Sequence, residues 1–459
     1  MRAQQVHQRA DLFEAQGVLR VCRPALPQQA PTPGQPPFVY SHASEGDECL
    51  LAVWDDGSVT ALHGHVDLGT GLRTALTQLV AEELHTNPSK VHLLMGLTAV
   101  SPNQGATIAS ASIQIHAAPL RAAAAQARQW LIAQAAQRWG LPPSEVQLQD
   151  GEVFCAPHGR LAWAALLKDQ AVDLPLQLDT ELKTPDQREW IGQSLPRVDI
   201  PAKVFADLIY VHDMRMPGML HGRVVRPPYA GADSGAFIGH TLDRVEASSI
   251  AHIPGIHAVV VQGDFVGVVA EREEHAEQAM RELQVHWKPW PGMHGTQDLE
   301  NAIRSNPSTP REVVNEGLVD QALADAAHTL QRTYVWPYQM HASIGPSCAV
   351  AWWHGLNNAD TPHRLLVWAG TQNPHALRAD VARLCGVHDT EVNIIRMEAA
   401  GCYGRNGADD VAADAALLSK AVGAPVRVQL THEQEHLWEP KGAAQLMQVR
   451  GGLGREGQP

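Results

Sequence analysis

The chain has 459 residues, of which 44% are hydrophobic and 18% are charged, and its formal net charge is −14. This composition is that of an ordinary globular protein, and the length allows about three domains. The acidic balance, without a clustered stripe of Lys and Arg, argues against a nucleic acid partner, because binding to phosphates needs concentrated positive charge.

The first residues contain no apolar run of the length that a signal peptide needs. Further along, no stretch approaches the roughly 18 consecutive apolar residues of a membrane helix. We therefore expect a cytoplasmic protein without a membrane segment.

The cysteines and histidines indicate no metal held by protein side chains. The six cysteines are scattered without a C-x-x-C pair, whereas structural zinc and iron–sulfur clusters need closely spaced thiolates. His63 and His65 alternate on a predicted strand, which favours a surface or core position over metal ligation. If the chain takes part in redox chemistry, its electrons must leave through another subunit.

The N-terminal part predicts a tail followed by a hairpin. Residues 1–45 are expected to form a flexible tail that ends in a linker rich in Pro and Gln. Residues 50–69 then predict two strands around the turn at Asp56 and Gly57, because apolar residues alternate on each side of it.

Gly69, Thr70 and Gly71 directly precede a predicted helix. The apolar residues of that helix fall on one face, namely Leu72, Leu76, Leu79, Val80 and Leu84. Two interpretations stay open for the glycine pair: its free N–H groups point at an anion, or it forms a plain helix cap with a tight turn.

Residues 101–112 combine small hydroxyl side chains with glycine, ahead of a long Ala-rich helix predicted over 118–139. Small residues let the backbone approach a bound group closely. They also permit close packing of the helix itself, so this segment alone does not decide between the two.

A glycine-rich corner at Gly401, Tyr403 and Gly404 follows a predicted strand over 392–397 and leads into an Ala-rich helical segment. Glycine tolerates positive φ and has no side chain, so bare backbone at such a corner can reach an oxygen-rich cofactor. A plain packing turn would use the same residues. The dinucleotide fingerprint G-x-G-x-x-G is absent, because the next glycine is Gly407, which makes a Rossmann site the poorer interpretation.

Six stretches in chain order together resemble one known family. The sequence is similar to the molybdopterin-binding large subunit of the xanthine dehydrogenase and aldehyde oxidase family, and most to its nicotinate dehydrogenase and isoquinoline oxidoreductase branch. The stretches are GHVDLGTGLRTALTQLVAEEL, PNQGATIASASIQ, MLHGRVVRPP, YQMHASIGPSCAVA, VWAGTQNP and GCYGRNGADDVAADAALL.

The resemblance implies a mixed α/β fold in which molybdenum-cofactor-binding domains flank an α/β-hammerhead domain. The implied division gives residues 46–198 to a molybdopterin-binding lobe, 199–290 to the hammerhead-like domain, 291–328 to a connector, and 329–459 to a second, C-terminally truncated molybdopterin-binding lobe.

The activity implied by the resemblance is that of a molybdenum hydroxylase, which oxidises an electron-poor carbon beside a ring nitrogen, or an aldehyde carbon, with water as the oxygen source. A nicotinate-like N-heteroaromatic acid is the expected substrate. The dithiolene of molybdopterin, expected as the cytosine dinucleotide form, would hold the metal, so no protein ligands to molybdenum are expected. Electrons would pass to a small partner subunit that carries 2Fe-2S clusters.

The resemblance also implies cofactor contacts, position by position. Gly69, Thr70 and Gly71 match a Gly-Gln-Gly loop, but Thr70 reaches less far than the family's glutamine. The other implied contacts are the Ser- and Ala-rich loop (Thr107, Ser110, Ser112), the loop beside the metal (Gln339, His341, Ala342) and the Gly-Gly-Phe-Gly loop (Gly401, Cys402, Tyr403, Gly404).

Two further positions bear on the substrate. Gly345 falls where purine-oxidising relatives carry a substrate-binding glutamate, and Asp409 falls where purine-specific members carry an arginine. Both differences argue against xanthine as the substrate.

The family's general base, a glutamate in a Gly-Val-Gly-Glu string, has no match in this chain, and neither has the family's Arg-Gly-Phe-Gly loop. The base is needed to take a proton as the oxygen attacks the substrate. The nearest carboxylates in sequence are Glu398 on a predicted strand and Glu433, Glu435 and Glu439 in a predicted exposed helix start. We expect none of them to act as the base, so the catalytic residue stays unknown.

A second hypothesis follows from that gap: a non-catalytic, truncated subunit or fragment that needs a second large chain for the base. If a C-terminal lobe that normally packs on the cofactor-binding domains is missing, apolar surface would be exposed, so the isolated chain should aggregate or recruit a partner. A third hypothesis, a nucleotide-binding module without redox chemistry, is disfavoured by the missing fingerprint.

Overall fold

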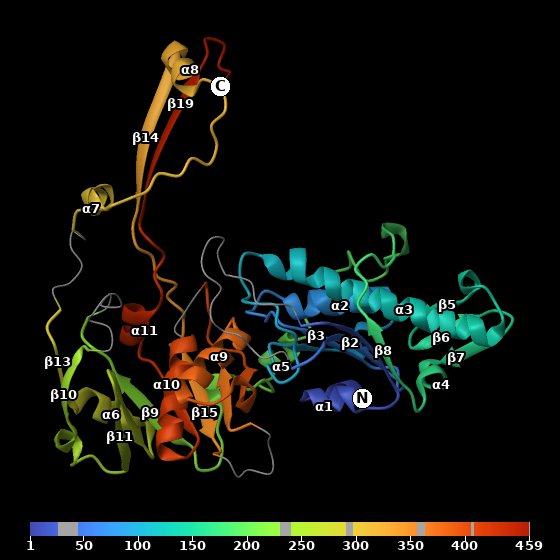
Figure 1. Cartoon of the computed structure of the whole chain (residues 1–459), viewed down its shortest axis with the longest axis horizontal. Coiled ribbons are helices and arrows are strands. Elements are labelled where there is room, and N and C mark those ends of the chain that lie inside the picture. The colour runs from blue at the N-terminus through green and yellow to red at the C-terminus, as the bar shows by residue number, and fades with distance from the viewer. Residues whose placement is uncertain (26–44, 230–239, 291–296, 356–362, 405–407, 459) are drawn as a thin grey trace.

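The computed structural model describes residues 1–25, 45–229, 240–290, 297–355, 363–404 and 408–458. Figure 1 shows two bodies side by side, each built on a sheet, and a two-stranded ribbon that rises away from them. Helices and strands are mixed throughout, which confirms the predicted α/β class. In the part of the chain so described, no helix is both long and apolar enough to cross a membrane.

The first body is built on a five-stranded sheet with the strand order β4-β3-β2-β1-β8. The strands are β1 (Val18–Arg23), β2 (Glu48–Trp54), β3 (Val59–His63), β4 (Val91–Met95) and β8 (Ala171–Pro175). Every residue of β2 and β3 is buried, because both faces of the sheet are covered. The predicted turn joins these two strands, with Gly57 at φ 79°.

Two helices pack on one face of this sheet, α2 (Leu72–Leu84) and α3 (Ala117–Trp139). Four consecutive alanines of α3, 122–125, are buried, and their small side chains allow the helix to lie close to its neighbours. A π-helical turn, η3 (Ser112–His116), runs directly into α3, so the helical path begins earlier than the predicted residue 118.

The N-terminus differs from the predicted flexible tail. Strand β1 lies inside the sheet, antiparallel to β2 and parallel to β8, and Val18, Leu19 and Val21 are fully buried. Helix α1 (Arg9–Phe13) covers the other face through the buried Leu12. The tail prediction is therefore wrong for residues 1–25, because VLRVCR is an apolar strand. The Pro- and Gln-rich part of the predicted linker, 26–44, lies outside the described residues.

The chain that follows β8 returns along α2 and is held there by a buried carboxylate. Glu82 accepts hydrogen bonds from the backbone N–H groups of Glu189 (2.9 Å), Trp190 (2.7 Å) and Ile191 (2.9 Å). It also pairs with the ammonium of Lys183 at 3.1 Å. The carboxylate of Glu82 thereby fixes the path of this stretch.

The second body is built on a seven-stranded sheet with the order β11-β12-β9-β18-β15-β16-β17. The strands are β9 (Leu220–Val225), β11 (Ile256–Gln262), β12 (Phe265–Ala270), β15 (Cys348–Trp353), β16 (Leu365–Ala369), β17 (Val392–Arg396) and β18 (Val426–Gln429). Helices α9 (Pro374–Cys385) and α10 (Ala408–Val422) pack on it.

The segment predicted as a separate domain, 199–290, shares this sheet. β9 pairs in parallel with β18, so that Gly222 lies opposite Val428. A side chain at Gly222 would come within 2.6 Å of Leu418 on α10, so glycine is required for this close contact. The segment also has a small core of its own beneath α6 (Glu273–Glu282). It combines strands and helices, and its strands β9, β11 and β12 continue the sheet of the C-terminal part.

Residues after β4 join the two bodies. Thr98 donates its backbone N–H to Ile394 O at 3.2 Å, and its hydroxyl accepts from Ile394 N–H at 2.8 Å, so the first body adds a short bridge to the edge strand β17. Arg378 of α9 donates to Thr98 O at 3.0 Å. These contacts bring residues 101–112 close to the loop that follows β16.

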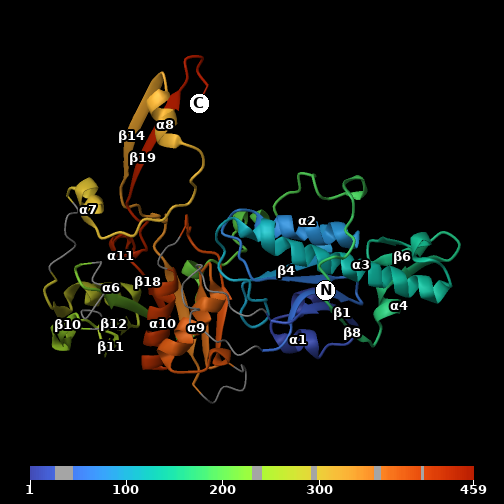
Figure 2. The same ribbon diagram turned by 45° about the horizontal axis from the view of Figure 1, so that its top comes forward.

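The ribbon consists of β14 (His328–Trp336) and β19 (Gln445–Leu453), which pair antiparallel. Figures 1 and 2 show it standing clear of both sheets, with α8 (Val319–Asp325) near its tip. The strand predicted at the start of the C-terminal lobe is present, but it lies in this ribbon. In the predicted connector, residues 291–296 lie outside the described part.

The remaining short elements complete the chain. They are η1 (Arg2–Gln5), η2 (Pro88–Lys90), η4 (Pro143–Glu145), β5 (Gln147–Gln149), β6 (Glu152–Cys155), β7 (Gly159–Ala162), α4 (Trp163–Leu167), η5 (Pro185–Gln187), α5 (Ile200–Val204), η6 (Val211–Asp213), β10 (Leu242–Glu246), η8 (Ala247–Ile250), β13 (Gln284–Trp287), α7 (Leu299–Ser305), η9 (Asp389–Glu391) and α11 (His432–Trp438).

Candidate cofactor site

Loops from the two bodies meet at Gln372, which follows β16. The backbone N–H of Thr107, from the first body, donates to Gln372 O at 2.9 Å. In return, the side-chain Nε2 of Gln372 donates to Thr107 O at 3.4 Å. Two loops that are 265 residues apart in the sequence therefore form one surface.

The same side chain also contacts the glycine corner. The thiol of Cys402 lies 3.0 Å from Gln372 Oε1 and 2.7 Å from Gly404 O, and Cys402 is buried. Gln372 was not among the predicted site residues. Its position in the string VWAGTQNP was the available signal, because that string carried part of the family resemblance.

The corner has the backbone geometry that its glycines predict. Gly401 has φ 121°, Tyr403 has φ 52° and Gly404 has φ 133°. A side chain at Gly404 would come within 2.3 Å of the His341 ring, so glycine is required there. Tyr403 is 62% exposed, which leaves its ring on the surface of the site. Gly407 lies outside the described residues.

The loop predicted to pass beside the metal lies against this corner. Glu439 Oε1 accepts hydrogen bonds from the backbone N–H groups of His341 (2.6 Å) and Ala342 (3.4 Å). Ala342 has φ 50°, so the carboxylate stabilises a strained turn. Gln339 forms a backbone bridge to Gly442 just before it. Within the described residues, His341 Nδ1 and Glu439 Oε2 are buried atoms without a hydrogen-bond partner.

The carboxylates weighed as a general base are mostly held by other groups. Glu435 and Glu439 are 0% and 3% exposed, so the expectation of an exposed helix start is wrong for both. Glu435 accepts hydrogen bonds from the backbone N–H and hydroxyl of Ser347. Glu398 pairs with Arg396 at 3.2 Å. Glu433 is exposed on α11, as expected.

The two predicted substrate positions have structural contacts. Gly345 packs against Ala400, and a side chain there would come within 2.3 Å of the Ala400 Cβ. Asp409, in the first turn of α10, accepts a hydrogen bond from the hydroxyl of Thr371 at 2.5 Å. Gly345 thus spaces two loops of the site, and Asp409 anchors the loop that carries Gln372.

The Gly69–Gly71 loop turns its N–H groups toward the protein. The carboxylate of Asp67 accepts from Gly69 N–H (2.8 Å), Gly71 N–H (3.3 Å) and Arg73 N–H (2.9 Å). Burial alone would raise the pKa of Asp67, but these N–H donors outweigh it and hold the pKa below its ordinary value. Two N–H groups of this loop, those of Gly69 and Gly71, are therefore bound by a carboxylate of the chain itself. Thr70 lies exposed on this loop.

Two of the three predicted hydroxyl residues of the Ser- and Ala-rich loop, Thr107 and Ser112, form side-chain hydrogen bonds within the chain. Thr107 Oγ1 accepts from Val66 N–H at 2.9 Å, and Ser112 Oγ lies 2.8 Å from His65 Nδ1. Ser110 is exposed, at φ 55°. The loop therefore presents Ser110 outward, while Thr107 and Ser112 fix its shape.

His63 and His65 lie in the core, as favoured from the sequence. Both are fully buried, and with His116 their ring centroids lie 4.2 to 6.5 Å apart. Burial lowers the pKa of His63 and of His65 to about 4, so both are neutral near pH 7. Across the described ranges, no group of His, Cys, Asp or Glu is arranged to hold a metal ion.

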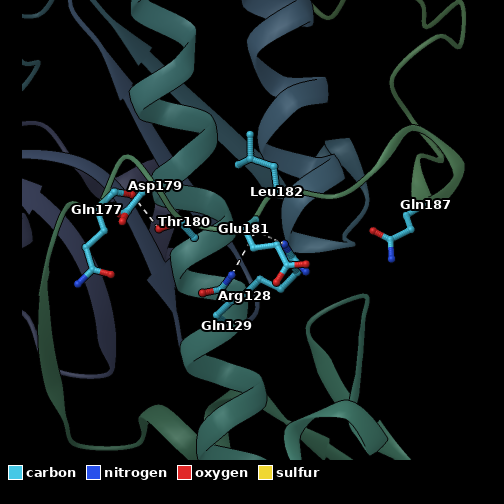
Figure 3. A pocket seen from close by; sticks show the side chains of 8 residues that line it. All are labelled: Arg128, Gln129, Gln177, Asp179, Thr180, Glu181, Leu182 and Gln187. Carbon is cyan, nitrogen blue, oxygen red and sulfur yellow. Dashed lines mark hydrogen bonds between the residues drawn. The ribbon is translucent and has the colours of Figure 1, made fainter.

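A polar cavity of about 450 Å³ opens beside α3 (Figure 3). Its lining is Arg128, Gln129, Gln177, Asp179, Thr180, Glu181, Leu182 and Gln187. Arg128 and Gln129 both donate to Glu181 O, which ties α3 to the returning chain. None of the predicted site residues lines this cavity, so we place the candidate site at the corner.

Comparison with known proteins bears on what this site holds. Residues 30–196 match one model described as a molybdopterin cofactor-binding domain, and residues 305–458 match another with the same description. The chain belongs to the molybdopterin cofactor-binding family. Thr107 lies in the first matched region of this molybdopterin-binding chain, and Gln372 and Cys402 lie in the second.

Individual relatives are longer than this chain. This chain is 53% identical over 457 residues to a nicotinate dehydrogenase subunit of Pseudomonas putida. The match covers 99% of this chain and 38% of that relative. The chain is 26% identical over 448 residues to the beta chain of isoquinoline 1-oxidoreductase from Brevundimonas diminuta, which covers 86% of the chain and 55% of that relative. The solved aldehyde oxidoreductase of Desulfovibrio gigas is 20% identical, with a TM-score of 0.46, over 61% of this chain and 34% of that one.

The corner residues of this molybdopterin-binding chain fit a pterin group on local grounds. Gly401 and Gly404 provide bare backbone at φ values that side chains rarely adopt, next to the exposed Tyr403. His341 Nδ1 is a buried polar atom without a partner in the described part of the chain, beside Gly404. In the Gly69–Gly71 loop, by contrast, Asp67 already accepts from the N–H groups of Gly69 and Gly71.

Proposed function

We propose that this chain is the molybdopterin-binding part of a molybdenum hydroxylase that acts on an N-heteroaromatic, nicotinate-like substrate with water as the oxygen source. One observation carries the proposal: Thr107 and Cys402, from the two matched cofactor-binding regions, both contact Gln372. A cofactor that requires both regions would find them already joined there. The substrate class is supported by the 53% identity to the nicotinate dehydrogenase subunit of Pseudomonas putida.

The residues of the chain would hold and orient the cofactor. Backbone at Gly401 and Gly404 would approach its oxygen-rich groups, and the exposed ring of Tyr403 would cover one side. Glu439 would keep the His341 backbone in place, because its carboxylate binds that N–H at 2.6 Å. When bound, the molybdenum cofactor supplies the two-electron oxidation of a substrate carbon.

The cofactor form, the electron partner and the location belong to the same proposal. We propose the cytosine dinucleotide form of molybdopterin and a small partner subunit with 2Fe-2S clusters, since the scattered cysteines of this chain suit no such cluster. The proposed location is the cytoplasm. Cys22 and Cys49 lie opposite each other on β1 and β2 as free thiols, a state typical of reducing compartments.

A second candidate function is a non-catalytic part that needs a second large chain for the general base. Three of the four carboxylates weighed for that task have protein partners: Glu398 with Arg396, Glu435 with Ser347, and Glu439 with the 341–342 backbone. The chain also spans only 38% of the Pseudomonas putida relative. In this version the chain binds the cofactor but does not turn over substrate alone.

Elemental analysis of the purified chain tests the proposal, with co-purifying proteins identified by mass. Wild type made with a supply of molybdenum cofactor should carry molybdenum, and acid release should yield a pterin nucleotide. Gly404→Ala should lose most of the metal, because the new Cβ meets His341. Gly386→Ala is the matched control, since that positive-φ glycine has open space around it. A wild type without molybdenum, or equal metal in both variants, would refute cofactor binding at the corner.

A further inference from the structure

Residues 197–213, here called the bridging segment, lie between the two matched cofactor-binding regions. The first region ends at residue 196 and the second begins at residue 305, so this segment belongs to neither of them. Figure 1 shows its helix α5 between the two bodies. Each end of the bridging segment nevertheless binds loops of the predicted cofactor site.

The N-terminal end of the bridging segment binds the Gly69–Gly71 loop. Nη1 of Arg197 donates to Gly69 O at 2.8 Å. Val198 N–H donates to the hydroxyl of Thr74, in the first turn of the helix that follows this loop, at 3.0 Å. This end therefore holds the loop of the first body through a backbone carbonyl oxygen and through the start of α2.

The C-terminal end of the bridging segment, η6, lies between two loops of the second body. Val211 N–H donates to Glu398 O at 3.0 Å, and Nε2 of His212 lies 2.7 Å from Pro346 O. A carbonyl oxygen only accepts hydrogen bonds, so Nε2 carries the proton and donates. Val211 is fully buried, and His212 is half-buried. Two adjacent residues thus bind the loop before β15 and the loop after β17.

These two loops touch each other at Gly345 and Ala400. Gly345 N–H donates to Ala400 O at 3.4 Å. A side chain at Gly345 would come within 2.3 Å of the Ala400 Cβ and 3.9 Å of His212 Nε2, so the loops are as close as glycine allows. Glu398 and Pro346 are each within two residues of this contact, so the hydrogen bonds from η6 fix the separation of the two loops.

Buried ion pairs hold η6 against the sheet of the second body. Nη2 of Arg427, on β18, donates to His212 O at 3.1 Å, and its Nη1 pairs with Glu273 of α6 at 2.9 Å. Glu273 also pairs with Arg223 of β9 at 2.7 Å. Both arginine side chains are at most 6% exposed, so salt screens these pairs little. The backbone of His212 is therefore fixed while its ring holds Pro346.

We propose that the bridging segment sets the spacing of the cofactor loops across the two bodies, and that His212 is a positioning residue of the cofactor site. Arg197 reaches the Gly69–Gly71 loop, and η6 reaches the two loops that meet at Gly345. Loops that are bonded to one short segment cannot move independently of each other. The role in cofactor binding rests on the proposed function, whereas the effect on the loops does not.

Replacements of histidine test the positioning role. His212→Leu removes the donor to Pro346 O, whereas His212→Gln keeps a side-chain N–H that can donate to it. His252→Leu is the control, because that histidine is 61% exposed and its ring pairs with Glu282. Amide exchange over 208–214 and 338–347 is measured on the full chain made without cofactor. Molybdenum content is measured on the full chain made with a supply of molybdenum cofactor.

Amides over 208–214 and 338–347 should exchange about tenfold faster in His212→Leu than in wild type, because Pro346 O loses this donor. The molybdenum content of this variant should fall severalfold. His212→Gln and His252→Leu should stay within about twofold of wild type in both measurements. All three variants should melt close to wild type, because His212 and His252 lie outside the hydrophobic cores of the two sheets.

The other end of the bridging segment offers a matched pair of its own. Arg197→Met and Lys203→Met each remove a cation that binds the Asp199 carboxylate at 2.6 Å, but only Arg197 also donates to Gly69 O. Arg197→Met should speed amide exchange over 67–75 and lower the molybdenum content, and Lys203→Met should do neither.

Exchange at the wild-type rate in either His212→Leu or Arg197→Met would overturn the proposal. So would a His212→Gln protein that exchanges as fast as His212→Leu, because the donor to Pro346 O would then not matter. Faster exchange with undiminished molybdenum would overturn the positioning role. A wild type that never binds molybdenum would refute the proposed function, and exchange in the cofactor-free chain would then decide whether the bridging segment sets the loop spacing.

Discussion

The side-chain oxygen of Gln372 accepts a hydrogen bond from the thiol of Cys402 at 3.0 Å. Thr107 binds the same residue from the other body, through its backbone N–H and its carbonyl oxygen. Gln372 therefore connects its own loop with the loops of Thr107 and Cys402. Thr107 lies in the first matched cofactor-binding region and Cys402 in the second. A change at Gln372 should loosen the site while leaving the two sheets intact.

Gln372→Ala should lower the molybdenum content severalfold and reduce the free energy of unfolding by about 1–3 kcal/mol. The substitution removes the side-chain hydrogen bonds to Cys402 and to Thr107 O, and the Thr107 carbonyl oxygen loses this donor, while the Cys402 thiol keeps Gly404 O. The backbone contact from Thr107 N–H would remain. Metal analysis and denaturant unfolding measure the two effects.

Gln321→Ala is the control for that change, because Gln321 lies on α8 and its side chain contacts Asp325 of the same helix. It should keep the wild-type metal content and stability. A Gln372→Ala protein with full molybdenum and unchanged stability would show that the bridge does not organise the site.

The corner shows what local pattern can predict. Gly401 and Gly404 were expected at positive φ because glycine follows a strand twice within four residues, and both have it. Local pattern also predicted the hairpin at Gly57. These features depend on residues that are close in sequence.

Other features depend on partners that no local pattern contains. Gln372 meets residues 30 and 265 positions away, and Glu439 is buried because it meets the backbone of His341, 98 positions away. A charged residue at a helix start is usually solvated, so its burial becomes evident only from those contacts. β1 was missed for a similar reason: the Pro-rich stretch after it suggested a mobile tail, whereas β2 and β8 hold the strand in the sheet.

Glu82→Ala should destabilise the first body by about 3 kcal/mol or more. The side chain is fully buried, and its loss would leave the N–H groups of Trp190 and Ile191 without their acceptor and Lys183 without this carboxylate partner. Glu181→Ala is the control, because that side chain is exposed on the same returning segment. Equal destabilisation by the two variants would contradict the anchoring assigned to Glu82.

Stability should also depend on pH through Glu82. Burial alone would raise its pKa, but the N–H donors of Ile191 and Trp190 and the Lys183 ammonium outweigh it, and the pKa is lowered from 4.5. A carboxyl with a lowered folded-state pKa contributes stability above its unfolded value and loses it as the pH falls through the folded value. Wild type should therefore lose more stability than Glu82→Gln on acidification below about pH 4.5. An equal loss of stability in both proteins would mean that groups other than Glu82 cause the acid sensitivity.

Asp414 should have the opposite pH dependence. Burial raises its pKa to about 6, and Arg226, at 2.6 Å, offsets this only in part. A carboxyl with a raised folded-state pKa stabilises the fold while protonated, and this contribution is lost as the pH rises from about 4 to about 6. The free energy of unfolding of Asp414→Asn should therefore rise relative to that of wild type between these pH values, by at most about 3 kcal/mol.

Denaturant unfolding at pH 4 and pH 7 measures this difference. Asp380→Asn, an exposed position on α9, is the control and should follow wild type at both values. The asparagine at 414 keeps an oxygen for Arg226, so the variant should fold normally. A stability difference that is the same at both pH values would mean that Asp414 does not titrate in this interval.

Substitutions at Glu439 distinguish between two roles for this residue, a structural anchor and a general base. Its Oε1 binds the His341 and Ala342 backbone, and its Oε2 is buried without a partner among the described residues. Glu439→Gln keeps an acceptor oxygen for those N–H groups, whereas Glu439→Ala leaves them unpaired at a cost of about 2–4 kcal/mol. If Glu439 is an anchor, the Gln variant should retain molybdenum within about threefold of wild type, and the Ala variant should lose it.

Turnover of a nicotinate-like heterocycle, measured with the chain alone and with the proposed second large chain added, then completes the test. An anchoring carboxylate predicts that Glu439→Gln keeps activity in proportion to its metal content, because the amide preserves the loop. A general base predicts full metal content with activity lost by a factor of about 100 or more, because an amide accepts no proton at neutral pH. The second result would place the base in this chain, and the need for a second chain to supply it would fall.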